Sequence, residues 1–207
     1  MLAARIFLSA ALAAFAGFAT AQSVGFDQQP AGRAPSDWTC GMTGRGAARW
    51  QVEVDAKAPS PPNVLVQRGK ADFPWCVNDG RVTQDGAVAV SFMPISGKED
   101  QAGGVLWRWK DGSTYYVARA NALESNVSLY YVTAGVRHTI KYQSAPVARD
   151  TWHRIEVRFL GEHIQVLLDG KSYIDVDDKR ISGAGKAGVW TKADSVTSFD
   201  DFVLTPR

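Results

Sequence analysis

Two arginines and an asparagine have the residue types and spacing that best suit ligand binding. Alternate side chains of an extended strand share a face, so Arg119 and Asn121 point to the same side of their strand. Arg108 lies on the preceding predicted strand. If these segments pair, two guanidinium groups and an amide come close together. Such donors suit sugar hydroxyls, a carboxylated sugar or a phosphate. The alternative is that the arginines pair with carboxylates such as Glu124 or Asp111 on a solvated face.

Aromatic side chains are plentiful around these segments and could stack on the apolar C–H faces of sugar rings. Neighbouring residues of a strand point in opposite directions, which places Trp107 and Trp109 opposite Arg108 and therefore in the interior. The aromatic residues that remain as candidates for ligand contact are Tyr116, Tyr130 and Trp190.

The N-terminal segment has the pattern of a secretory signal. A single charge at Arg5 precedes an apolar run over residues 6–18 and a small-residue triplet at 19–21, so we expect cleavage before Gln22 and an exported mature chain, periplasmic or extracellular. No second stretch approaches the ~18 apolar residues of a membrane span. Loss of Arg5 lowers the formal net charge from +2 to +1, and mixed charges give no electrostatic case for nucleic acid.

Cys40 and Cys76 are the two cysteines of the chain. An even pair in a chain bound for an oxidising compartment favours a disulfide over two free thiols. Closing a loop of this length would stabilise the fold by about 4 kcal/mol through loop-closure entropy. Neither cysteine has the spacing of a zinc site.

After residue 45 the sequence consists of short runs in which apolar and polar residues alternate, separated by turns such as Asp111-Gly112 and Asp169-Gly170. This pattern predicts an all-β fold, and about a dozen strands in one domain, residues 22–207, require two packed antiparallel sheets. The predicted strands cover residues 48–54, 63–67, 87–95, 103–110, 114–121, 127–133, 137–143, 153–160, 163–168, 172–176, 187–191 and 199–204.

Residues 150–204 resemble the concanavalin A-like lectin/glucanase superfamily, in particular its laminin-G-type and bacterial 3-keto-disaccharide hydrolase-like members. The resemblance is carried by four motifs in order: W-H-x-h-x-V at Trp152, V-x-L-D-G at 166–170, G-x-x-G-h-W-T at 185–191 and F-D-D-F at 199–202. It implies a jelly-roll sandwich. It implies little about function, because the superfamily mixes lectins, hydrolases and adhesion modules.

The same resemblance weakens an enzymatic interpretation. In the hydrolase-like group a strand of the form G-Y-E-x-Q carries an acid, and here Val117 stands at the acidic position and Arg119 at the glutamine position. The retaining glucanases carry E-x-D-x-x-E, with carboxylates about 5.5 Å apart, whereas Glu53 and Asp55 have no second glutamate after them. Loop carboxylates that could act instead are Asp194, beside Lys192, and the pair Glu99 and Asp100.

Acidic residues near the two ends of the mature chain are similar to the calcium site that many β-sandwich sugar-binding modules build where their termini meet. Carboxylate and backbone oxygens are the ligands that calcium needs, so Asp27 and Asp200 are candidates for a structural calcium ion. The alternative is a carboxylate that accepts hydrogen bonds from a turn.

The leading hypothesis is a secreted carbohydrate-binding sandwich that recognises a glycan on its concave sheet. The alternatives are a glycoside hydrolase acting on disaccharides, including 3-keto-disaccharides, or on polysaccharide, and an envelope adhesion module that binds protein. The sequence leaves the oligomeric state open. The predicted ligand-binding residues are Arg108, Tyr116, Arg119, Asn121, Trp190, Lys192 and Asp194.

Overall fold

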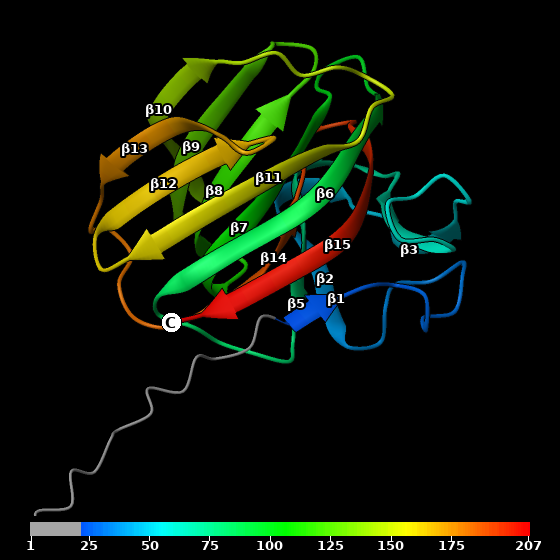
Figure 1. Ribbon diagram of the computed structural model, residues 1–207, viewed down its shortest axis with the longest axis horizontal. Helices are drawn as coiled ribbons and strands as arrows, with labels where there is room; N and C mark the ends of the chain where they lie inside the picture. The colour runs from blue at the N-terminus through cyan, green and yellow to red at the C-terminus, as the bar shows by residue number, and fades with distance from the viewer. Residues whose placement is uncertain (1–21) are drawn as a thin grey trace, which may run out of the picture.

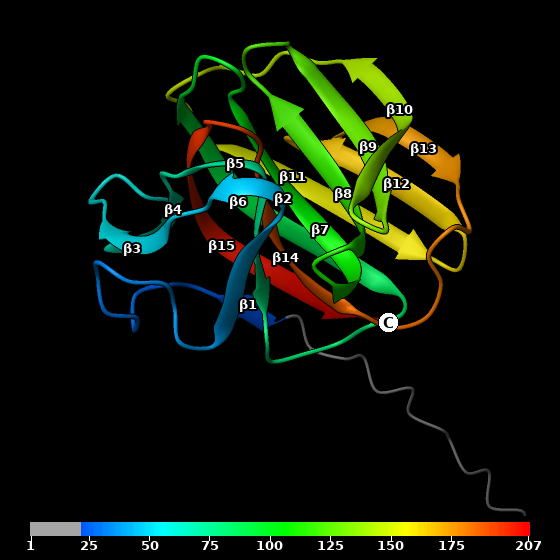
Figure 2. The same ribbon diagram turned by 180° about the vertical axis from the view of Figure 1, so that it is seen from behind.

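The computed structural model describes residues 22–207, which form fifteen β-strands and no helix (Figures 1 and 2). The predicted signal peptide, residues 1–21, lies outside the described residues. The strands form two antiparallel sheets that pack face to face, as the alternating sequence pattern predicts. The described part of the chain contains no helix that is long and apolar enough to cross a membrane.

Sheet A has eight strands and sheet B has seven. Sheet A runs, in spatial order, through β13 (Lys171–Asp177), β12 (His163–Leu168), β11 (His153–Leu160), β6 (Gly86–Ser96), β15 (Val196–Pro206), β4 (Asn63–Gln67) and β3 (Trp50–Val54), with β1 (Gln22–Val24) paired to β15. Sheet B runs through β10 (Val136–Ser144), β9 (Asn126–Thr133), β8 (Thr114–Asn121), β7 (Ala102–Asp111), β14 (Lys186–Trp190), β5 (Lys70–Asn78) and β2 (Trp38–Ala47).

The main core lies between the sheets and follows from the two-residue period. In β11, Ile155, Val157 and Phe159 are buried in this core, while Glu156 and Arg158 point to the free face of sheet A. A second buried cluster lies on the free face of sheet B, the face turned away from sheet A. It contains Trp75, Val77, Leu106, Tyr115, Val117, Tyr130, Val132 and Trp190.

The predicted disulfide joins Cys40 to Cys76. These residues are directly opposite each other on β2 and β5, in the register that pairs the edge strand β2 with its single neighbour. The bond therefore links the outermost strand of sheet B to the strand beside it.

A bulge in β7 reverses the predicted orientation of two side chains. The pairing of β7 with β8 shifts between Trp107 and Asp111, and Arg108 has a φ of 48°. Trp107 lies in the main core as predicted, but Trp109 packs against Trp75 on the free face of sheet B. The prediction that Trp109 is interior was wrong because the inserted residue breaks the strict alternation.

Candidate functional site

Sheet B curls so strongly that its outer strands approach each other across the free face, which is therefore concave. The guanidinium carbon of Arg137, on β10, lies 4.3 Å from the ring centroid of Tyr130 on β9 and 4.9 Å from that of Phe73 on β5. β10 and β5 are separated by four strands in the sheet. Beneath this arch Phe73 stacks on Trp190 at 5.8 Å, and Trp190, Tyr115 and Tyr130 are fully buried.

A network of charged and amide groups lies beside these aromatics and centres on Asp100, which is fully buried. One carboxylate oxygen of Asp100 accepts hydrogen bonds from Arg119 (3.0 Å) and Lys192 (2.7 Å), and the other accepts one from the Asn121 amide (2.8 Å). Arg119 also donates to Glu124 at 2.5 Å. Arg119 and Asn121 lie together as predicted, Lys192 joins them, and Asp100 is the group that links all three.

The ionisation of this network suits binding better than proton transfer. Burial opposes ionisation of Glu124, but hydrogen bonds from Asn126 and the charge of Arg119 outweigh it, so the pKa of Glu124 lies below its ordinary value of 4.5. Burial raises the pKa of Tyr130 to about 12, although the charge of Arg119 opposes the rise. At neutral pH Glu124 is a carboxylate and not a general acid, and Tyr130 keeps its proton.

Asp194 has a supporting position. Its carboxylate accepts backbone N–H groups from Lys98 (2.8 Å), Glu99 (2.9 Å) and Asp100 (3.2 Å). Burial alone would raise the pKa of Asp194, but these backbone hydrogen bonds lower it overall. Asp194 therefore fixes the loop that carries Asp100, and its oxygens are already occupied by the loop.

The part of the concave face that solvent reaches is a ring of residues around the buried network. Tyr142 is 49% exposed, and its hydroxyl accepts a 2.8 Å hydrogen bond from the hydroxyl of the buried Tyr130. This accessible surface combines aromatic faces, cations, a carboxylate and an amide, which is the mixture that sugar rings and their hydroxyls require. We call it the sheet B site; it comprises Phe73, Glu124, Asn126, Arg137, Tyr142 and Lys192.

Two predicted ligand-binding residues lie elsewhere. Arg108 is 3% exposed, and its guanidinium donates to the backbone carbonyls of Gln84, Gly161 and Ile181 at one end of the sandwich. The bulge at Arg108 turns its side chain away from the concave face, so its predicted place beside Arg119 was wrong.

Tyr116 is also buried between the sheets. Its hydroxyl donates to the Asp178 carboxylate (2.5 Å) and accepts the Ile181 backbone N–H (3.0 Å), while its ring stacks on Trp107. Burial, reinforced by the hydrogen bond to Asp178, raises its pKa. The neighbouring Tyr115 faces the concave side, so the inward member of this tyrosine pair is Tyr116.

The two proposed calcium ligands have separate protein partners. Asp27 accepts the backbone N–H of Asn63 (3.0 Å), whereas Asp200 accepts the backbone N–H of Ser60 (2.8 Å) and is fully buried. Burial raises the pKa of Asp200, which disfavours its charged form. Within residues 22–207 no three acidic, histidine or cysteine side chains gather as a metal site would need. These carboxylates match the alternative prediction of turn acceptors.

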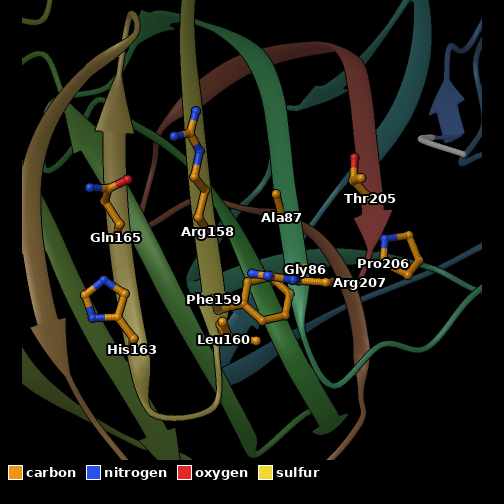
Figure 3. A pocket seen from close by; sticks show the side chains of 10 residues that line it. All are labelled: Gly86, Ala87, Arg158, Phe159, Leu160, His163, Gln165, Thr205, Pro206 and Arg207. Carbon is orange, nitrogen blue, oxygen red and sulfur yellow. The ribbon is translucent and has the colours of Figure 1, made fainter. Parts of the chain in front are cut away.

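A hollow of about 660 Å³ lies on the free face of sheet A (Figure 3). It forms where β6 presents only Gly86 and Ala87, between Arg158 and Leu160 on β11 and the end of β15. Two of its polar side chains are already paired: Arg158 binds Glu156 at 2.6 Å, and Gln165 binds Asp175 at 3.1 Å. The hollow is open, but it presents no buried polar group.

Solved structures with the same architecture include a carbohydrate-binding module, CBM66, from Bacillus subtilis, which is 18% identical, with a TM-score of 0.65 over 80% of this chain and 93% of that one. The chain has the concanavalin A-like jelly-roll fold. The jelly roll also superposes on a β-1,3-1,4-glucanase (lichenase) from a mouse hindgut metagenome (15% identity, TM-score 0.59, 90% and 99% of the two chains). The β-glucanase of Bacillus licheniformis is similar too (12%, 0.53, 93% and 99%).

At these identities the likeness concerns the fold alone. No protein-family model matches the sequence, and no curated protein matches it.

Of the six residues of the sheet B site, sequence reasoning named only Lys192 as a ligand contact, and Phe73 and Arg137 show why such residues are missed. Phe73 comes from a strand that was not predicted, and Arg137 meets it only through the curvature of the sheet. The alternation of β10 gives the face of Arg137, but it carries no signal for a contact across four intervening strands.

Proposed function

We propose that this protein is an exported carbohydrate-binding β-sandwich that holds a glycan on the concave face of sheet B. The observation that carries the proposal is the sheet B site itself: half-exposed aromatic and hydrogen-bonding side chains above a buried network that holds them in place. The superposition on a module named for carbohydrate binding supports it. The Cys40–Cys76 disulfide supports export, because such bonds persist in oxidising compartments.

The carboxylates of the site favour binding over hydrolysis. Asp100 is fully buried and its oxygens are taken up by three donors, and the lowered pKa of Glu124 means that Glu124 does not supply the protonated acid that glycoside cleavage needs. We expect the purified protein to bind glycans without releasing reducing sugar. Release that is lost in Glu124→Gln would replace this proposal with a hydrolase.

Affinity gel electrophoresis through gels that contain single polysaccharides, followed by calorimetry on the best ligand, tests the proposal. Tyr142→Ala removes one exposed aromatic contact, worth about 1 kcal/mol, and should weaken binding about fivefold. Leu160→Ala is the matched control, because Leu160 has a similar exposure (47%) on sheet A. Retardation by no neutral or charged polysaccharide, or equal loss in both variants, would overturn the proposal.

A further inference from the structure

Arg137 differs from the other arginines of the sandwich in its surroundings. Its guanidinium is held between two aromatic rings, Tyr130 and Phe73, at the centre of the arch over the concave face. Cation–π contacts of this kind are attractive, but they satisfy no N–H group. The guanidinium is therefore positioned by rings and keeps its hydrogen-bond donors for another partner.

The donors of Arg137 have no acceptor in the part of the chain that the structure describes. Its Nη1 is shielded from solvent and makes no hydrogen bond, and no carboxylate of residues 22–207 lies within ion-pair distance of it. Arg119, which is 1% exposed, has a second such donor in its Nε. Arg119 is closed off by the network around Asp100, whereas Arg137 is half-buried and has no carboxylate partner among the described residues, so Arg137 is the cation that an anion reaching the concave face would meet.

The charges of the site give the sign of that acceptor. Arg119 and Lys192 are balanced by Asp100 and Glu124, with which they form ion pairs. Arg137 adds one further positive charge with no counterpart among the described residues. A planar guanidinium with a free edge matches the geometry of a carboxylate or a sulfate.

We infer that the ligand of the sheet B site is an acidic glycan, one that carries a uronic acid carboxylate or a sulfate ester, and that Arg137 binds this anionic group. The inference rests on the proposed function for the sugar part of the ligand. The anion sits at the free edge of the guanidinium, while the sugar ring lies against the exposed aromatic side chains. Arg137 then determines specificity for charged over neutral glycans.

Calorimetry with four probes tests this: an oligogalacturonate, its fully methyl-esterified form, a sulfated galactan oligosaccharide and a neutral glucan oligosaccharide. The full mature chain should bind one of the two charged probes at least tenfold more tightly than the neutral probes, and more weakly as salt is raised. The carboxylated and sulfated probes distinguish the two sources of the anion. Arg137→Gln should remove the preference and keep the weaker neutral binding.

Two variants serve as controls. Arg158→Gln removes an exposed arginine from sheet A and should leave the preference intact. Arg137→Lys keeps the positive charge but lacks the planar guanidinium. Binding should therefore keep its salt dependence but lose most of its preference for charged glycans. This variant provides a second test if Arg137→Gln does not fold.

The two proposals fail in different ways. Equal affinity for charged and neutral probes, or a preference that survives in Arg137→Gln, overturns the acidic ligand while glycan binding through Tyr142 stands. Binding to no probe overturns both.

Discussion

The free faces of the two sheets place their charges in opposite ways. On sheet A, Arg158 and Glu156 form a pair at the surface beside an open hollow, and solvent reaches both side chains. On sheet B, Arg119 and Asp100 are buried together, and the concave face is filled by its own side chains. The face with the open hollow therefore has the simpler chemistry.

This difference shows that an open hollow and a buried polar network need not lie on the same face of the sandwich. A polar network buried on a sheet face is costly unless every member is satisfied, and it holds its members in one arrangement. The network around Asp100 satisfies most of its own groups, and the donor left over is the Nε of Arg119. The arrangement is what a recognition surface needs before its ligand arrives.

The largest effect expected is from Asp100→Ala. This change leaves Arg119 buried beside Lys192 without their shared carboxylate, and breaking a buried ion pair costs about 3–5 kcal/mol of unfolding free energy. The equivalent change on sheet A, Glu156→Ala, should cost less than about 1 kcal/mol because its pair is solvated. Urea unfolding of both variants measures the difference, and equal losses would contradict the contrast between the faces.

A smaller effect is expected from Asp194→Ala. The carboxylate binds three backbone N–H groups of the loop before β7, and hydrogen bonds to a charged group contribute about 1.5–3 kcal/mol. Asp175→Ala on sheet A removes an exposed carboxylate and should change stability by less than about 0.5 kcal/mol. Amide hydrogen exchange should accelerate at Lys98, Glu99 and Asp100 in Asp194→Ala but not in Asp175→Ala. Unchanged exchange in Asp194→Ala would mean that other contacts hold the loop before β7.

The pH dependence of stability should show a modest contribution from Glu124. Its folded-state pKa is below 4.5, so the stabilisation is present above its unfolded pKa and is lost as the pH falls through the folded pKa. The effect is small because the side chain is 42% exposed. Glu124→Gln should flatten the acid limb of the stability curve, which thermal unfolding between neutral and acidic pH measures. A limb as steep as that of the wild type would assign the acid sensitivity to other carboxylates.

The smallest effect is expected from filling the hollow. Ala87→Leu adds an apolar side chain above the small-residue part of β6, and a surface change of this kind should alter unfolding free energy by about 0.5 kcal/mol or less. Retardation by glycans should not change. Loss of binding in this variant would move the site from sheet B to sheet A.

Much of the fold was predictable because most strands follow strict alternation with clear turns. The chain stretches that became β2 and β5 were not predicted. β2 contains Gly41, Gly44 and Gly46, and β5 contains Pro74, residues that strands usually avoid. These strands are identified by their pairing with each other, which sequence periodicity does not report.

The candidate site was predictable only where one strand or one turn decides the geometry. Alternation correctly placed Arg119 beside Asn121, since both come from the unbroken strand β8. It failed at Arg108, where one extra residue in β7 turns the side chain to the end of the sandwich. Arg137 and Phe73 required the curvature of the whole sheet, which depends on packing summed over many residues.

The Cys40–Cys76 bond affects how well the edge strand β2 of sheet B resists proteases. An edge strand can peel from its neighbour one hydrogen bond at a time, and β2 has β5 as its one neighbour in the sheet. A covalent link within the paired segment stops such peeling at its position. Once the bond is reduced, β2 is free to detach and β5, which carries Phe73, becomes the new edge of the sheet. Cleavage by a protease would then begin beside the sheet B site.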